Sequence, residues 1–407
     1  MRIEVPIDGD AIRDEVARWL QDNPWRDVRR AAWLRRVADA RWAGPTWPVE
    51  WYGRGWTAAQ AQVVAEEFAA AGAPGAGQDQ FNLVANTVLA FGDDALKRRF
   101  MLPLLTEEVT VCLLYSEPGA GSDLAGLQTT AERNGNDWVV NGQKVWTSGA
   151  RMADYGMLIA RTDWDVPKHQ GLTFFVFPMR QAGVEVRPIT QITGERHFNE
   201  VFITDARVPD DNRLGDVGAG WRVLQTALAY ERLVMSGDNR APGRSTDSQR
   251  PEDPVWGTSP DLVRLAVQEH RTDDPVLRQS LARAYTLRMV NRWSARRVAA
   301  LLEQGTSSPL SSLAKLMMSR IVHSEARVQA QIIGARALLS GEMHPSGDSA
   351  TFQALNAYFT SIGGGTDQIQ RNIVGERLLG LPKEPAVDRD LPFRLVRRGT
   401  SETWRPK

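Results

Sequence analysis

The chain has 407 residues, of which 42% are hydrophobic and 24% charged, so it is long enough for several domains and too apolar to be disordered. Lysine plus arginine number 49, as do aspartate plus glutamate, and the resulting zero net charge predicts that the chain binds neither nucleic acid nor an anionic membrane. Cys112 is the only cysteine, which excludes an internal disulfide and a cysteine-rich metal site.

The first residues carry acidic side chains where a secretion signal would have an apolar core, and no stretch reaches the ~20 apolar residues of a membrane span. Together with the lack of disulfides, these features predict a cytoplasmic protein. Cys112 itself lies in an apolar run and is expected to be a small buried hydrophobe.

Residues 1–110 predict an N-terminal helical domain in which helices alternate with glycine and proline. Thr57 and Gln60 have the spacing of a helix capping box. Further along, apolar residues recur at helical spacing, and Asp93 can cap a following helix that ends near Pro103. The recurring apolar residues are Phe81, Val84, Val88 and Phe91.

Residues 111–216 predict a β-domain, because short runs of β-forming residues alternate with turns. Asn134-Gly135 and Asn141-Gly142 are both dipeptides that favour tight hairpin turns. The links between the runs are too short for crossover helices, so the strands are expected to be mostly antiparallel and to form a small barrel or sandwich. Further strands are predicted at residues 155–161, 172–177, 184–189 and 200–203.

Residues 217–407 predict a C-terminal helical bundle, since long apolar patterns with helical spacing return there. A stretch near 237–260 is rich in Pro, Gly, Ser and Asp and is expected to be a long surface loop. The chain is therefore expected to be an α+β protein with helical, β and helical domains in that order. The apolar patterns comprise Leu224 and Leu228, then Leu281, Tyr285, Met289 and Trp293, then Leu313, Met317 and Ile321.

A glycine-rich loop follows the first predicted strand and contains Gly119 and Gly121, where backbone amides could approach a ligand closely. Such loops also serve as plain turns. The next hairpin places Trp146, Thr147 and Ser148 at the end of a strand, with an aromatic face and two hydroxyls side by side. This combination suits a flat heterocyclic ligand.

Five stretches carry a more specific signal: EPGAGSDLAGLQT, WVVNGQKVWTSGA, FNEVFITDARVP, AQIIGARALL and GGGTDQIQRNIVGERLLGLPKE. In their amino-acid sequences and in their order along the chain, they resemble motifs of the acyl-CoA dehydrogenase family, over roughly residues 80–385. The resemblance implies FAD as cofactor, an acyl-CoA thioester as substrate, α,β-dehydrogenation as the reaction and an electron-transfer flavoprotein as acceptor. It also implies the same succession of domains and a homo- or hetero-oligomer, either a dimer or a tetramer.

The resemblance assigns ligand contacts position by position. Ser122 and Arg232 are assigned to the substrate side of the cleft. Thr366 has a second interpretation, as the N-cap of the helix that follows it. The implied FAD contacts are Ser116, Gly121, Trp146, Ser148, Thr366 and Gln368 within one subunit, and Arg271, Gln331 and Gly334 from a neighbouring subunit.

The catalytic base requires separate treatment, because many family members carry it as a glutamate where this chain has Gly364. A second branch, with isovaleryl- and long-chain-type enzymes, places the base in a stretch written ERL, which is matched here at Glu231. Glu231 also shares a helical face with Leu224 and Leu228, where burial would raise the pKa of a carboxylate toward that of a base near neutral pH. A buried ion pair or a helix edge near solvent would explain the position without catalysis.

Gly364 keeps one function of its position, because glycine retains the backbone N–H that family members donate to the thioester carbonyl. The resemblance therefore implies catalysis by Glu231 together with the Gly364 amide. The glycines at 363–365 also leave room for a bulky or branched acyl group, such as a steroid side chain.

Two departures from the family pattern leave other functions open. Glycine at 364 and the stretch 270–275, which lacks the family's Phe-Gly pair, are compatible with a non-catalytic subunit that completes the FAD pocket of a relative. An enzyme of the same scaffold that uses oxygen as acceptor is a second alternative. Glu231 argues against the non-catalytic subunit.

Overall fold

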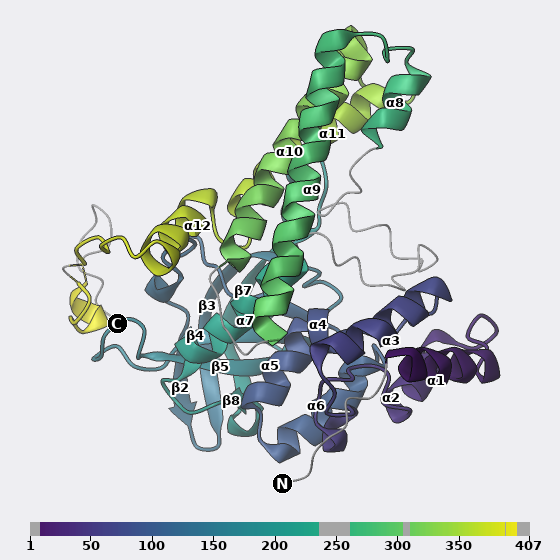
Figure 1. The fold of residues 1–407 in the computed structure, drawn as a ribbon. Helices are drawn as coiled ribbons and strands as arrows, with labels where there is room; N and C mark the ends of the chain where they lie inside the picture. The colour runs from purple at the N-terminus through teal and green to yellow at the C-terminus, as the bar shows by residue number, and fades with distance from the viewer. Residues whose placement is uncertain (1–8, 236–260, 304–309, 387, 397–407) are drawn as a thin grey trace.

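The computed structural model describes residues 9–235, 261–303, 310–386 and 388–396. An N-terminal group of helices and a central sheet form the body, and C-terminal helices project from it (Figure 1). This arrangement confirms the predicted α+β fold class. The surface loop predicted near 237–260 lies outside the described residues. Within the described ranges, no helix is long and apolar enough to cross a membrane.

The N-terminal helices begin and end close to their sequence signals. Thr57 and Gln60 form the predicted capping box, with the Gln60 amide donating to Thr57 Oγ1 at 3.3 Å and the Thr57 amide donating to Gln60 Oε1 at 2.9 Å. Asp93 caps the last of these helices by accepting the Leu96 amide at 2.7 Å. The helices are α1 (Gly9–Asp22), α2 (Arg30–Asp39), α3 (Ala58–Ala70), α4 (Gln78–Phe81), α5 (Leu83–Phe91) and α6 (Asp94–Leu105).

The apolar pattern over residues 81–91 is interrupted in a way that its spacing does not predict. Asn82 separates α4 from α5, and its side chain accepts the Ala85 amide at 2.9 Å as the cap of α5. An asparagine side chain that caps a helix competes with continuation of the preceding helix. The regular apolar spacing therefore spans two helices.

The sheet has eight strands in the order β6-β7-β3-β2-β4-β5-β8, with β1 paired to β4. Most pairs are antiparallel, as predicted, whereas β1 and β2 each pair with β4 in parallel. The strands are β1 (Val111–Leu114), β2 (Thr130–Asn134), β3 (Asp137–Ser148), β4 (Tyr155–Arg161), β5 (Leu172–Pro178), β6 (Val184–Pro188), β7 (Phe198–Pro209) and β8 (Arg213–Leu214).

The sheet curls over one core and presents its other face to the helices. Phe175 of β5 and Val201 of β7 share the core inside the curled sheet. Cys112 belongs to this core, as predicted, and burial raises the pKa of its thiol to about 12. Phe174 points to the opposite face, where it joins a core with the N-terminal helices and with Leu224.

One predicted hairpin turn is present and the other is wrong. Asn134-Gly135 lies at the turn between β2 and β3, where Gly135 has a φ of +64°. Asn141-Gly142 instead lies inside β3, at a register shift against β7. A Cβ at Gly142 would come within 2.3 Å of Thr129 Oγ1, so this glycine permits a close approach of two chain segments at a bulge.

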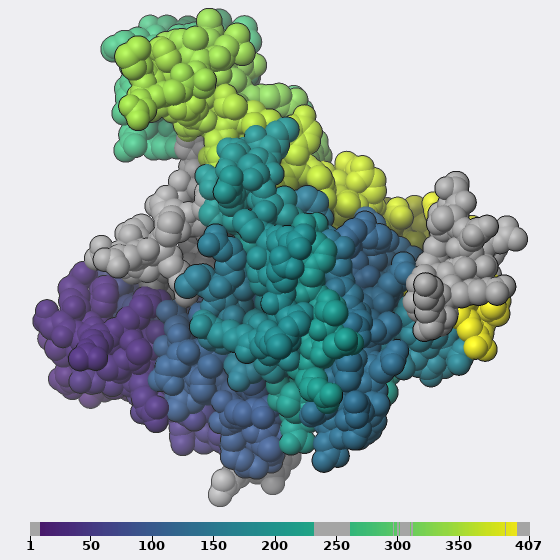
Figure 2. Space-filling model, turned by 180° about the vertical axis from the view of Figure 1, so that it is seen from behind, coloured from purple at the N-terminus to yellow at the C-terminus, as the bar shows by residue number. Residues whose placement is uncertain are grey.

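The C-terminal helices form two groups. Helix α7 packs on the face of β5 and against α4 and α5, so it belongs to the body. Helices α8 to α11 form what we call the stalk, which stands apart from the body when the molecule is seen from behind (Figure 2). The helices are α7 (Gly220–Met235), α8 (Leu262–Gln268), α9 (Pro275–Glu303), α10 (Ser311–Ile333), α11 (Pro345–Ile362) and α12 (Asp367–Ile373).

Candidate active site

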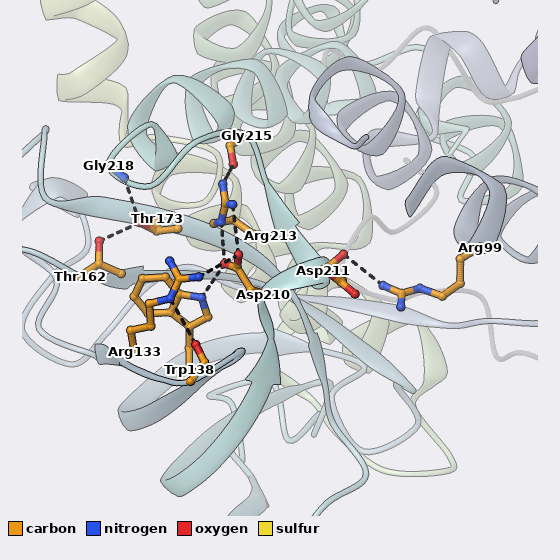
Figure 3. A network of polar contacts seen from close by, with 11 residues as sticks. Arg99, Arg133, Trp138, Thr162, Thr173, Asp210, Asp211, Arg213, Gly215 and Gly218 are labelled. Atoms are coloured by element: carbon orange, nitrogen blue, oxygen red, sulfur yellow. Dashed lines mark hydrogen bonds and ion pairs between the residues drawn. The ribbon is translucent and has the colours of Figure 1, made fainter. Parts of the chain in front are cut away.

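The segment between β7 and α7 is fixed by a carboxylate at its centre (Figure 3). Asp210 Oδ1 accepts hydrogen bonds from Trp138 Nε1 at 2.8 Å and from Arg213 Nε at 2.9 Å. Arg213, and to a smaller extent Trp138, lower the pKa of Asp210 to about 2. The carboxylate thus stays charged near neutral pH and joins β3 to the entry of α7.

The start of α7 is also fixed against β5. The Gly218 amide donates to Thr173 Oγ1 at 3.0 Å, and Thr173 contacts the Thr162 hydroxyl at 2.7 Å (Figure 3). A Cβ at Gly220 would come within 2.7 Å of the Leu172 carbonyl oxygen, so the first turn of α7 lies directly on the strand. These contacts set the direction in which α7 runs toward Glu231.

Glu231 lies half-buried near the end of α7, on the helix face that carries Leu224 and Ala227. Its negative charge acts on Tyr115, which directly follows β1: burial is the main reason that the pKa of this phenol lies well above its usual value, and the charge of Glu231 adds to the increase. The charge of Glu231 is therefore felt by the residue that precedes the glycine-rich loop.

A buried ion pair supports the glycine-rich loop. Lys144 Nζ lies 2.9 Å from Glu117 Oε1 and donates to the Tyr115 carbonyl at 3.1 Å. The Glu117 carboxylate also accepts the amides of Gln128 and Thr129 at 2.6 and 2.9 Å. Burial alone would raise the pKa of Glu117, but Lys144 and these donors outweigh burial and leave that pKa below its usual value. The pair ties both ends of the loop to β3.

Trp146 and Ser148 face solvent, whereas Thr147 between them is buried, as expected for alternation along a strand. The two hydroxyls of this stretch therefore do not lie side by side, contrary to the expectation from sequence. The Trp146 ring is 58% exposed and lies edge-on to Phe198, with ring centroids 5.9 Å apart. The ring centroids of Phe198 and of Phe359 in α11 are 5.5 Å apart, so aromatic rings connect the β-domain to the C-terminal helices.

Phe359 leads directly to the glycine turn at 363–365, which joins α11 to α12. Gly364 and Gly365 have φ values of +65° and +85°, which favour glycine. Gln370 Nε2 donates to the Gly364 carbonyl at 2.9 Å, while the Gly364 amide donates to no acceptor among the described residues. The turn thus presents a backbone N–H without a partner in the part of the chain that the structure describes.

The remaining residues assigned to the body have simpler surroundings. Ser116 accepts the Val145 amide at 2.9 Å through its carbonyl, and Gly121 and Ser122 are exposed on the loop. Thr366 caps α12 by accepting the Ile369 amide at 3.2 Å, which confirms the capping interpretation and leaves a ligand contact open. Gln368 is exposed. The side chain of Arg232 lies outside the described residues.

Arg271 lies in the turn between α8 and α9, and Gln331 and Gly334 lie at the end of α10, so all three belong to the stalk, whereas Trp146 belongs to β3 of the body (Figure 1). Arg271 pairs with Asp274 at 2.8 Å in the turn before α9. Gly334 ends α10 with a φ of +68° and is exposed.

Gln331 lines a cavity of about 470 Å³ on the stalk, which we call the arginine pocket. Three arginines line it, and none has an acidic partner among the described residues: Arg283, Arg320 and Arg327. Asp367 also lines the pocket, but its carboxylate accepts a hydrogen bond from Ser319 Oγ at 2.9 Å and pairs with Lys315 Nζ at 3.5 Å. The pocket therefore has uncompensated positive charge suited to an anionic ligand. No cluster of His, Cys, Asp or Glu within the described ranges could hold a metal ion.

Sequence reasoning missed several residues that the structure brings to the site. Tyr115 reads as one more apolar strand residue, and Phe198 and Phe359 carry no motif of their own. Lys144 stands at an even number of residues from the apolar Trp138 and Val140, so strand alternation was the available signal that this charged residue of β3 is buried.

Comparison with known proteins decides the family. The acyl-CoA dehydrogenase N-terminal, middle and C-terminal domains match residues 8–108, 112–206 and 262–379, respectively. The chain belongs to the acyl-CoA dehydrogenase family. It is 36% identical over 404 residues to acyl-CoA dehydrogenase IpdE1 of Mycobacterium tuberculosis, covering 93% of this chain and 99% of that protein.

Other relatives agree. Acyl-CoA dehydrogenase FadE34 of Mycobacterium tuberculosis is 35% identical over 353 residues, covering 85% of this chain and 46% of that protein. A chain of the ChsE4-ChsE5 complex from Mycobacterium tuberculosis is 28% identical, with a TM-score of 0.69 over 94% of this chain and 100% of that chain. A chain of the Tcur3481-Tcur3483 steroid ACAD is 25% identical, with a TM-score of 0.71 over the same shares.

As an acyl-CoA dehydrogenase, the protein is an FAD-dependent oxidoreductase that acts on acyl-CoA thioesters, as the sequence predicted. The residues of this structure fit a bound flavin dinucleotide. Trp146 offers an exposed ring for an aromatic heterocycle, and the Gly364 amide is an available donor nearby. The arginine pocket has the charge that a diphosphate requires.

Proposed function

We propose that this acyl-CoA dehydrogenase is itself catalytic and uses Glu231 as the base that removes the α-proton of its acyl-CoA substrate. The observation that carries this proposal is the action of the Glu231 charge on Tyr115, next to Ser116. It supports a position of the carboxylate near the loop that resembles the flavin-binding loop of the family. A silent subunit would not require a carboxylate on this half-buried helix face.

The proposed chemistry divides between a side chain and the backbone. The Gly364 amide donates to the thioester carbonyl and stabilises the negative charge that develops there, which makes the α-proton more acidic. Glu231 takes that proton and becomes neutral. FAD, when bound, supplies the acceptor for the β-hydrogen as hydride.

We further propose that FAD contacts come from two chains. Ser116, Gly121, Trp146, Ser148, Thr366 and Gln368 would contact the flavin side within one subunit. Arg271, Gln331 and Gly334 would contact the FAD of a neighbouring subunit, which their position on the stalk supports. Ser122 and Arg232 are proposed to contact the acyl-CoA.

For the substrate, we propose a bulky acyl group such as a steroid side chain. Two observations support it: no side chain projects from the turn at 363–365, and one relative is described as a steroid ACAD. Two relatives are assemblies of two different chains, which supports a hetero-oligomer for this chain too. An electron-transfer flavoprotein remains the proposed acceptor and the cytoplasm the proposed location.

Glu231→Gln tests the central proposal because it keeps the size of the side chain and removes the proton acceptor. We expect the rate of anaerobic flavin reduction by a steroid-type acyl-CoA to fall by ~10² or more, while FAD content is retained. Glu132→Gln on exposed β2 is the matched control and should reduce its flavin at the parent rate. An unaltered rate in Glu231→Gln would exclude Glu231 as the base.

A further inference from the structure

The C-terminal segment of the chain returns to the loop between β4 and β5, on the side of the body away from α1 (Figures 1 and 2). We call residues 388–396 the C-terminal strap. The Phe393 amide donates to the Val166 carbonyl at 2.9 Å, and the Arg394 amide donates to the Trp164 carbonyl at 3.1 Å. Backbone hydrogen bonds therefore fix the strap to the sheet.

A side chain of the strap covers a buried guanidinium. Phe393 is 1% exposed, and the guanidinium carbon of Arg161 lies 3.4 Å from the centroid of its ring. Arg161 is the last residue of β4 and is fully buried. A cation over an aromatic face is attracted to it, and the attraction is stronger where water is excluded. Phe393 thus binds one face of Arg161 and shields it from water.

The edge of the same guanidinium holds the glycine-rich loop. Arg161 donates to the Ala125 carbonyl through Nη2 at 2.6 Å and to the Leu127 carbonyl through Nε at 3.1 Å. Hydrogen bonds from a charged donor are strong, and they are stronger still where water cannot compete for the donor. Both carbonyls lie a few residues after Ser122, which we propose to contact the acyl-CoA.

An ion-pair network makes a second connection between strap and loop. Lys168 Nζ lies 2.9 Å from the carboxylate of Asp123, which directly follows Ser122, and 3.5 Å from that of Asp388 in the strap. Arg161 also donates to the Lys168 carbonyl at 3.2 Å, so both connections belong to one network. Because the Asp123 side chain is 64% exposed, this ion pair contributes less than the buried arginine.

We propose that Phe393 is a positioning residue for acyl-CoA binding: by shielding Arg161, it keeps the glycine-rich loop in the conformation that receives the substrate. The inference rests on the proposed contact between Ser122 and the acyl-CoA. A loop that is ordered beforehand loses less conformational freedom on binding, so the affinity is higher. The strap lies beyond residue 379, where the match to the family's C-terminal domain ends, and so adds a support that this domain does not include.

Phe393→Ala in the FAD-loaded enzyme tests the inference. Water can then reach Arg161 and compete with the loop carbonyls, so the dissociation constant of a steroid-type acyl-CoA should rise ~10-fold. The rate of flavin reduction at saturating substrate should stay within about twofold of the parent, because the proposed catalytic groups are unchanged. Anaerobic single-turnover reduction at varied substrate concentration measures both. A general loss of structure would instead lower the saturated rate and the FAD content as well.

Leu395→Ala is the matched control, because Leu395 lies on the same strap and is 58% exposed. Its dissociation constant and its saturated rate should equal those of the parent. Phe393→Leu keeps most of the apolar volume and removes the aromatic face, so we expect a rise of about 3-fold in the dissociation constant. This variant carries the test if Phe393→Ala does not retain its fold.

Hydrogen exchange in the FAD-loaded enzyme without substrate examines the loop itself and needs no chemistry. Within the loop, the Gly126 amide donates to the Asp123 carbonyl at 2.9 Å, and the Leu127 amide donates to the Leu124 carbonyl at 3.3 Å. These amides should exchange ~10-fold faster in Phe393→Ala than in the parent and in Leu395→Ala, because the loop opens more often.

The outcomes separate this inference from the proposed function. Unchanged exchange in Phe393→Ala would overturn the positioning role and leave the proposed function in place. Faster exchange with an unchanged dissociation constant would overturn it too, and would contradict the proposed contact between Ser122 and the acyl-CoA. If Glu231→Gln reduces its flavin at the parent rate, the base assignment fails, whereas faster exchange and weaker substrate binding in Phe393→Ala would still support the role of the strap.

Discussion

The proposed site in the body and the arginine pocket on the stalk differ in how their charges are paired. Around the proposed site in the body, Lys144 pairs with buried Glu117 and Asp210 pairs with Arg213, each within the same chain. On the stalk, the arginines of the arginine pocket have no acidic partner among the described residues, and Leu338 is 89% exposed. The difference indicates that one half of the site is completed by its own chain, whereas the other half presents its surface to another molecule.

The largest expected effect concerns the self-contained half. Lys144→Met leaves the Glu117 carboxylate buried without its cation, which typically costs about 3–5 kcal/mol of the free energy of unfolding. Urea denaturation followed by tryptophan fluorescence measures it. The double variant Lys144→Met with Glu117→Leu removes both charges and should recover much of the loss. A single variant as stable as the parent would contradict the view that this ion pair holds the loop.

A smaller effect is expected on the stalk, and it should appear in cofactor binding rather than in stability. Arg320→Gln with Arg327→Gln removes two of the unpaired charges, so the dissociation constant of FAD should rise ~10-fold. The unfolding free energy of the apoprotein should change by less than about 0.5 kcal/mol, because exposed arginines contribute little to folding.

The control for the stalk prediction is Arg297→Gln, an exposed arginine of α9 that does not line the pocket. Fluorescence of released FAD during titration measures the dissociation constants. The double variant could instead lose as much unfolding free energy in the apoprotein as it loses in FAD binding free energy. That result would contradict the contrast between stalk and body.

The smallest effect depends on pH and again concerns the body. The pKa of Asp210 is about 2, below its usual value of 3.8, so its charged contacts stabilise the fold above about pH 4, and this contribution is lost as the pH falls through 2. Asp210→Asn should be less stable than the parent by about 1 kcal/mol at pH 7. The gap, measured by urea denaturation, should narrow between about pH 4 and pH 2. A gap independent of pH would show that shape, not charge, matters at this position.

Local signals predicted those parts of the fold whose causes lie within a few residues. The capping box at Thr57 and the bounds of the strand at 155–161 needed only neighbouring residues. The hairpin turn predicted at Gly142 is wrong because the contact that requires a glycine there comes from Thr129, which lies in another segment of the chain. The prediction that the hydroxyls of Thr147 and Ser148 lie side by side is wrong because the side on which each hydroxyl lies depends on which face of the strand is buried.

The site was predictable to the extent that motifs mark it. Sequence motifs pointed to Glu231 and to the glycine turn at 363–365, and helical spacing also supported Glu231. Tyr115 could not be found this way, because the charge of Glu231 that acts on it comes from a helix more than 100 residues away in the sequence. The same holds for Phe198 and Phe359, which touch across the boundary between two domains.

The position of Gln331 and Gly334 on a projecting stalk has a consequence for handling the enzyme. If one chain supplies part of the pocket in which another chain holds its FAD, dilution that separates the chains also releases the flavin, by mass action. Cofactor content would then vary with total protein concentration, and added FAD would in turn hold the assembly together. Specific activity measured at low concentration would report the association of the chains as much as their chemistry.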